Sequence, residues 1–126
     1  MRNLSKVLIV CVASLCTVAI ANTGDVDLRA NLTGVGEGKA EWKVSDSGTR
    51  LRAELEVDGE NLAADSTFTV TVGSNAPFTV TTDAVGEFKS DMRFNTATRP
   101  VVNVGDSVTV ADDTSTVVLS GVLQNH

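Results

Sequence analysis

Few side chains of this sequence are of the types that perform acid–base or nucleophilic chemistry. The 126 residues include one histidine, His126, at the last position, and no tyrosine. A Ser-His-Asp arrangement needs a histidine that a third group orients, and we expect a terminal side chain to lack such support. Both cysteines, Cys11 and Cys16, lie within the first 21 residues. We therefore expect no catalytic residue, no zinc site and no enzymatic activity.

The 16 Asp and Glu residues are the remaining groups of chemical interest. Paired carboxylates for glycoside hydrolysis need one acid with a raised pKa inside a cleft, whereas the acids here alternate with apolar residues or sit in turns, as on a solvated face. Calcium takes oxygen ligands from loops, and two acidic groups are candidates for it: Asp58, Glu60 and Asp65, and Asp106, Asp112 and Asp113. Aspartate is also an ordinary turn residue, and neither group has EF-hand spacing. We favour turn chemistry and keep calcium as the one alternative cofactor.

Threonines form a second pattern, which points to contact rather than catalysis. They alternate with apolar residues and leave one face of two predicted strands without charge, at Thr67, Thr69, Thr71, Thr79 and Thr81. The simplest interpretation is that threonine suits exposed strands. The alternative is a contact surface for a partner chain, a polysaccharide or ice, because desolvating hydroxyls costs less than burying unpaired charges. If the protein self-associates, we expect these two strands at the interface.

The elements that position these residues are predicted to be β-strands. After position 21 the chain has 16 Val and 14 Thr, which are stiff β-branched residues that suit a pleated surface. Apolar and polar residues alternate in most of the expected strands, and residues 116–123 are apolar on both faces, which predicts a strand covered on both sides or pairing at a junction. We expect about eight antiparallel strands forming a single sandwich or small barrel; the expected strands are 26–32, 39–44, 50–57, 67–72, 78–81, 88–94, 108–110 and 116–123.

Turn residues separate these strands, and Asp58-Gly59 is among the predicted turns. Residues 60–66 are the least β-like stretch and are predicted to cross between sheets. For the hairpin between 39–44 and 50–57 we expect a register that opposes Glu41 to Arg52 and Lys39 to Glu54, since each attractive pair contributes about 0.2–1 kcal/mol. That register points Trp42 into the core opposite Leu51 and leaves Ser45-Asp46-Ser47-Gly48 as the loop.

The first 21 residues predict a cleaved secretory signal, so the expected organisation is a signal peptide at 1–21 and one all-β domain at 22–126. Arg2 and Lys6 give a positive start, an apolar run follows, and Ala19 and Ala21 are the small residues before the cut. The apolar run is about 15 residues long and a spanning helix needs about 20. We therefore expect no membrane insertion after signal removal, with an uncleaved anchor and a lipoprotein as the alternatives.

Cleavage would leave eight basic and 16 acidic residues, a net charge of −8, in a domain without cysteine. Such a domain repels phosphate backbones and anionic lipid, so nucleic-acid and membrane-surface binding are not expected. Without disulfides it depends on its core alone for stability. Asn31-Leu32-Thr33 matches a glycan acceptor pattern, but it lies within a predicted strand, which argues against modification.

Several segments together resemble a short all-β domain found in secreted bacterial proteins: Gly38–Trp42, Leu51–Val57, Thr79–Phe88, Val104–Val108 and Val117–Gly121. The resemblance spans roughly residues 25–123 and departs from the common pattern at Gly73–Pro77, where an Asn-Gly hairpin is usual. It implies an all-β fold and export, and no activity. We expect a secreted, non-enzymatic module with a structural, adhesion or assembly role at the cell surface or extracellular matrix. The alternative is a small-ligand or carbohydrate-binding domain, with or without calcium; the expected partners are another copy, a surface protein or a polysaccharide.

Overall fold

The computed structural model describes residues 25–46 and 51–126, and in these ranges every helix-or-strand element is a β-strand. The prediction of an all-β fold is confirmed. The predicted signal peptide lies outside the described residues. No helix in the described ranges is long and apolar enough to cross a membrane.

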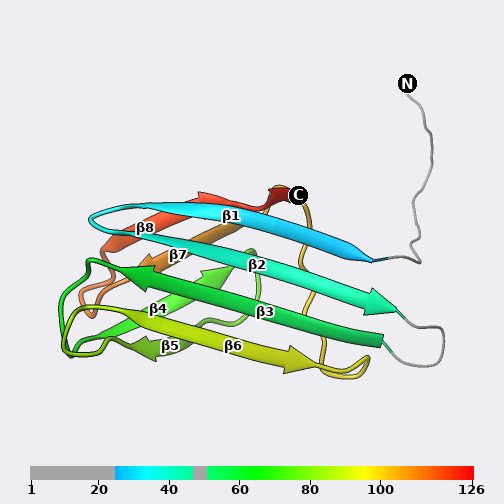
Figure 1. Cartoon of the computed structure of the whole chain (residues 1–126), viewed down its shortest axis with the longest axis horizontal. Helices are drawn as coiled ribbons and strands as arrows, with labels where there is room; N and C mark the ends of the chain where they lie inside the picture. Colours follow the sequence, from blue (N-terminus) through cyan, green and yellow to red (C-terminus); the bar gives the residue numbers. More distant parts are fainter. Residues whose placement is uncertain (1–24, 47–50) are drawn as a thin grey trace.

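One nine-stranded antiparallel sheet forms the domain and curls until it is nearly a closed barrel. Its hydrogen-bonded order is β5-β4-β7-β8-β1-β2-β3-β6, with β9 added beside β1. Figure 1 shows β1, β2, β3 and β6 as one layer, with β4, β5, β7 and β8 behind it. The strands are β1 (Val26–Gly34), β2 (Glu37–Asp46), β3 (Leu51–Glu60), β4 (Thr67–Val72), β5 (Phe78–Thr81), β6 (Phe88–Phe94), β7 (Ser107–Ala111), β8 (Val117–Val122) and β9 (Gln124–Asn125).

Alternation along the strands places the core between the two layers. Leu28, Trp42 and Leu55 are buried from the β1-β2-β3 layer, and Val70 and Val110 are buried from the opposite layer. Each of these residues sits between polar neighbours that face outward. The period of two predicted from the sequence is therefore the one that separates core from surface.

Two long connections close the ends of the barrel. Residues 61–66 cross from β3 to β4, which confirms the crossing predicted for 60–66, and residues 95–106 cross from β6 to β7 at the opposite end (Figure 1). Thr82 fastens the first crossing, because its buried Oγ1 donates to the Ala63 carbonyl (2.6 Å) and accepts from the Ser66 N–H (2.9 Å). Asn75 fastens the second by donating from Nδ2 to the Val101 carbonyl (2.8 Å).

β8 joins the two layers. It pairs with β7 along its length and with β1 at Ser120 and Leu119, so the predicted junction is confirmed. The alternative prediction, a strand covered on both faces, is wrong. Val117 and Val122 are 53% and 46% exposed, so the described residues leave the outer face of β8 open to solvent.

The register of the β2–β3 hairpin differs from the expected one. The predicted opposition of Glu41 to Arg52, and of Lys39 to Glu54, is wrong, although Trp42 is buried as expected. β2 continues through Asp46, and the rest of the predicted loop lies outside the described residues. The observed pairs include Lys39–Asp58, Glu41–Glu56, Trp42–Leu55 and Lys43–Glu54.

Neighbouring strands explain why a register that opposes two glutamates is adopted. Arg29 of β1 brings its Nε within 2.7 Å of Glu41 Oε2. Lys89 of β6 brings its Nζ within 3.7 Å of Glu56 Oε2. Glu41 and Glu56 therefore each have a cation on the next strand outside the hairpin. A prediction from the β2 and β3 sequences alone does not include these two cations.

The predicted turn at Asp58-Gly59 is also wrong, because β3 continues through Glu60. Gly59 meets a packing requirement instead of a turn requirement. A Cβ built at this position would lie 2.5 Å from Cε2 of the Phe88 ring on β6. Glycine lets the buried ring of Phe88 lie directly against the β3 backbone.

Candidate contact surface

The two layers expose chemically different outer surfaces. The outward residues of β1, β2, β3 and β6 are largely charged, and we call this surface the charged face. The outward residues of β4, β5, β7 and β8 carry no ionisable group in the described structure. We call this second surface the neutral face; it consists of Thr67, Thr69, Thr71, Thr79, Thr81, Ser107, Thr109, Ala111, Val117, Ser120 and Val122.

Strand pairing brings all five predicted threonines together on the neutral face. The β4–β5 register opposes Thr67 to Thr81 and Thr69 to Thr79. Thr71 continues the pattern toward β7. Directly opposed residues on one face have Cβ atoms about 4.5–5.5 Å apart, so the hydroxyls form two adjacent rows. The structure thus assembles the predicted residues into one surface.

Three hydroxyl residues of the neutral face were not predicted from the sequence. Thr109 of β7 lies between Thr71 of β4 and Ser120 of β8, and Ser107 of β7 lies opposite Val122. The signal that could have found them is the alternation of hydroxyl and buried residues in 107–110 and 119–120. They widen the uncharged surface from two strands to four.

Acidic side chains flank the neutral face at the two ends of β7 instead of lying on it. Asp112 Oδ1 accepts from the N–H groups of Thr114 (2.9 Å) and Thr116 (3.0 Å) and from the Thr114 hydroxyl (2.7 Å). These bonds, led by the hydroxyl of Thr114, hold the pKa of Asp112 below its ordinary value. At the other end, Asp106 Oδ2 accepts from the Asn103 N–H (2.9 Å).

This placement overturns the grouping of Asp106 with Asp112 and Asp113 as one calcium candidate. The five residues of β7 separate Asp106 from the other two, and an extended strand of that length spans roughly 17 Å. Aspartate is an ordinary turn residue, and this preference accounts for its presence at both ends of β7.

The second calcium candidate is also dispersed. Asp58 lies on the charged face between Lys39 and Lys89, which oppose it from the neighbouring strands. Glu60 ends β3, and Asp65 lies in the crossing, where its N–H donates to the Asp83 carbonyl (3.0 Å). Nowhere in residues 25–46 and 51–126 do three His, Cys, Asp or Glu side chains lie close enough together to hold a metal ion.

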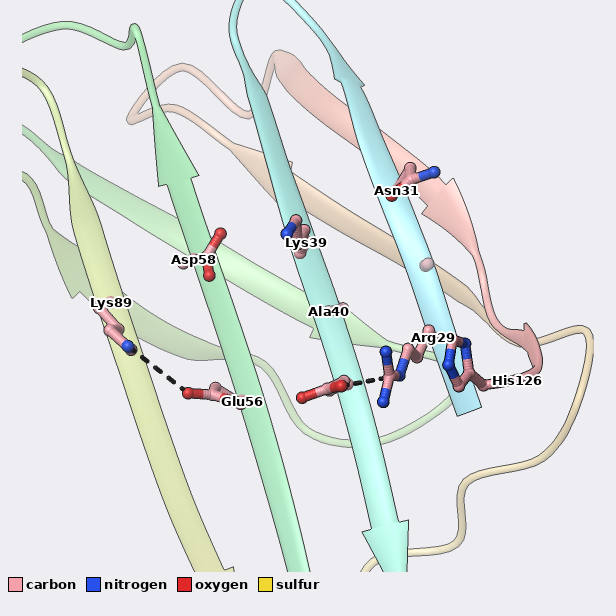
Figure 2. Close-up of a pocket in the computed structure, with 10 residues that line it drawn as sticks. Arg29, Asn31, Lys39, Ala40, Glu56, Asp58, Lys89 and His126 are labelled. Carbon is pink, nitrogen blue, oxygen red and sulfur yellow. Dashed lines mark ion pairs between the residues drawn. The ribbon is translucent and has the colours of Figure 1, made fainter. Parts of the chain in front are cut away.

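The charged face carries several neighbouring ion pairs, some of which Figure 2 shows. Beyond the Arg29–Glu41 and Lys89–Glu56 pairs, Arg93 Nε of β6 lies 3.7 Å from Glu54 Oε2. A hydrogen bond to the Asp91 carboxyl, partial desolvation and the charge of Asp91 raise the pKa of Glu54 above its ordinary value.

His126 lies at the border of the charged face beside Arg29 (Figure 2). Its backbone N–H donates to the Asp27 carbonyl (3.0 Å), and this bond holds the backbone of His126 beside β1. The shallow groove around it is lined by charged, amide and alanine side chains, with no hydroxyl or thiol nucleophile among them. Ion pairs such as Arg29–Glu41 are the main feature of this groove.

No protein-family model matches this chain, and no curated protein matches it at a significant level.

Proposed function

We propose that this protein is an exported, non-enzymatic adhesion module whose neutral face binds an uncharged polymer at the cell surface or in the extracellular matrix. The observation that carries the proposal is the lack of ionisable outward side chains on four adjacent described strands. The same chain has 21% charged residues, and the opposite layer holds them at high density. A solvated surface needs no such division, whereas a contact surface benefits from it.

Desolvation explains why a contact would use the neutral face. Burying an unpaired charge is far more costly than burying a hydroxyl, which regains its hydrogen bonds from a polar partner. Breaking the charged face would also sacrifice its internal pairs, such as Arg29–Glu41 at 2.7 Å. Threonine adds little entropic cost, because its β-branched side chain is already restricted in a strand.

The size of the neutral face favours a repeating partner. Four strands about 4.8 Å apart and about five residues long cover roughly 300 Å² in plan. A stable pair of proteins buries about 800 Å² on each partner. One neutral face is too small for such a pair, but many copies on one polymer gain affinity through multivalency.

The expected signal peptide supports export, and the absence of cysteine after position 21 is compatible with an oxidising compartment. A polymer outside the cell is therefore the class of partner that we propose. Neutral polysaccharide has the required chemistry, since it is uncharged and presents hydroxyl groups at regular intervals.

The test is retention of the purified protein on insoluble neutral polysaccharides (cellulose, chitin and a β-glucan). Thr69→Lys with Thr79→Lys places two charges at the centre of the neutral face and is expected to lower retention at least tenfold. The matched control, Asn31→Lys with Ser45→Lys, adds the same charge at exposed outward positions of β1 and β2 on the charged face. It is expected to retain wild-type binding.

Equal losses in the two double variants would mean that added charge, and not the neutral face, controls retention. Failure of the wild-type protein to bind any of the three polymers would reject neutral polysaccharide as the partner. The melting temperatures of both variants are expected to lie close to that of the wild-type protein, because every substituted position is solvent-accessible.

A further inference from the structure

β6 is an edge of the sheet with an unused row of backbone donors and acceptors. It pairs with β3 on one side, and among the described strands no ladder joins its other side to β5. Ser90, Met92 and Phe94 point toward the core, yet they are only partly buried. An uncovered edge of this kind is a template for pairing with another strand.

The charges along this edge complement themselves when the strand is reversed. Outward positions read Glu87, Lys89, Asp91 and Arg93, which alternate in sign. In an antiparallel pair of two identical strands centred on Ser90, Lys89 of each copy lies opposite Asp91 of the other. Glu87 of each copy likewise lies opposite Arg93 of the other, so all four outward pairs are attractive.

Shifting the centre by one residue reverses every interaction. A pair centred on Asp91 opposes Asp91 to itself and Lys89 to Arg93. A pair centred on Lys89 opposes Lys89 to itself and Glu87 to Asp91. The sequence therefore selects the Ser90 register over both neighbours, whereas an edge that only resists pairing is best served by charges of one sign.

We infer that β6 pairs with β6 of a second copy of this chain, antiparallel about a twofold axis through Ser90. The inference does not rest on the proposed function, because it uses the opposite layer of the molecule. The inward residues agree with it, since the register places Phe88 beside Met92 of the other copy and covers side chains that one copy leaves partly exposed.

The surroundings of Asp91 within one copy favour the same partner. Asp91 lies opposite Glu56, and its carboxyl group raises the pKa of the nearby Glu54. The nearest cation in its own chain is Arg93, whose Nη2 is 4.0 Å from Asp91 Oδ2. Within one copy, Lys89 pairs with Glu56 and leaves Arg93 to serve both Glu54 and Asp91. Lys89 of a second copy would bring a third cation to this cluster of three acids, on the side of Asp91.

The charged side chains are free to make these contacts. The Lys89 and Arg93 side chains are 70% and 71% exposed. Figure 2 shows Lys89 on β6, directed over the surface toward Glu56. Ion pairs this exposed contribute little to the fold, so their charges can be exchanged without unfolding the monomer.

The experiment is sedimentation equilibrium of the purified protein between about 10 µM and about 1 mM, compared with charge variants. We expect a monomer–dimer equilibrium in the wild-type protein. Lys89→Glu is expected to weaken it at least tenfold, because a twofold axis makes one substitution affect two pairs. Adding Asp91→Lys to Lys89→Glu recreates both pairs with exchanged signs and is expected to restore the dissociation constant to within about threefold.

Thr69→Lys with Thr79→Lys is the control for location and is expected to leave dimerisation unchanged. Loss of the dimer in this control with retention in Lys89→Glu would place the interface on the neutral face and overturn the inference. A wild-type protein that stays monomeric at about 1 mM, or a double variant that fails to recover, would overturn it as well. Thermal melting of each variant confirms that the monomer is folded, and retention on polysaccharide reports separately on the proposed function.

Discussion

Thr82 fastens the connection that leads to the layer of β4, β5, β7 and β8. Replacing its hydroxyl is expected to destabilise the whole domain. The side chain is 3% exposed and follows directly after β5. Its Oγ1 donates to the Ala63 carbonyl and accepts from the Ser66 N–H, while its own N–H donates to the Ser66 carbonyl (2.9 Å). One residue therefore fixes the crossing that delivers the chain to β4, and with it the position of the neutral face.

Thr82→Val keeps the shape of the side chain and removes both hydroxyl bonds. It leaves the Ser66 N–H without its acceptor and the Ala63 carbonyl without its donor in a partly buried site. Each unsatisfied group costs about 1–3 kcal/mol, so the expected loss is about 2–4 kcal/mol. For a domain of this size that corresponds to a Tm lower by roughly 10–20 °C.

Thr82→Ser is the matched variant, because it keeps the hydroxyl and removes only a methyl group, at about 1 kcal/mol. Thermal unfolding followed by circular dichroism measures both variants against the wild-type protein. If the valine variant is as stable as the serine variant, the hydroxyl does not fasten the crossing and the reasoning is refuted.

Two further predictions concern the turns. Gly86 (φ +80°) and Gly105 (φ +91°) both have backbones that favour glycine, but a Cβ at Gly86 would lie 2.1 Å from the Leu62 carbonyl oxygen, whereas one at Gly105 meets nothing within 4 Å. In calorimetry, Gly105→Ala should lower the free energy of unfolding by only the conformational penalty of about 1–2 kcal/mol. Gly86→Ala should lower it by distinctly more, and equal losses of stability in the two variants would contradict the packing argument. Asp112 has a lowered folded pKa, so the stability it contributes is complete above its unfolded value and is lost as the pH falls through the folded one. Asp112→Ala should lower Tm at pH 7 and flatten the decline in Tm below about pH 4, and an unchanged acid profile would contradict this.

The sequence was sufficient for the fold class because local and global preferences agree. β-branched residues alternate with polar ones, and the same alternation separates the core from the surface in the structure. The sequence was also sufficient to predict that the five threonines face outward, since residues two apart on a strand share a face regardless of which strands are neighbours. The crossing at 60–66 was readable from the absence of that alternation.

Register was not readable from two strands alone. Every register of odd residue sum keeps Trp42 buried, and the pairwise charges of one hairpin distinguish them by only about 1 kcal/mol. Arg29 and Lys89, which neutralise Glu41 and Glu56, come from strands whose positions beside the hairpin are set by the tertiary structure. The sequence pattern also could not show that Gly59 accommodates the Phe88 ring instead of forming a turn.

The full neutral face was likewise hidden, because it depends on strand order. β7 and β8 are distant from β4 in the sequence, and only the order β5-β4-β7-β8 places Thr109 beside Thr71 and Ser120 beside Thr109. The dispersal of the acidic groups has the same origin. Asp106 and Asp112 are near neighbours in sequence, but an extended strand holds them apart.

The most direct test of the central claim is to map the contact on the protein itself. Nuclear magnetic resonance of the methyl groups and backbone amides, during titration with soluble cello- and chito-oligosaccharides, reports on both faces in one experiment. We predict that the methyl signals of Thr69, Thr79 and Thr109 shift or broaden together. Added salt up to about 0.5 M should leave the effect unchanged, because no charge is involved. Shifts that gather instead on the backbone amides of the charged face around Glu41 and Glu56, or that vanish with salt, would contradict the assignment of the neutral face as the contact surface.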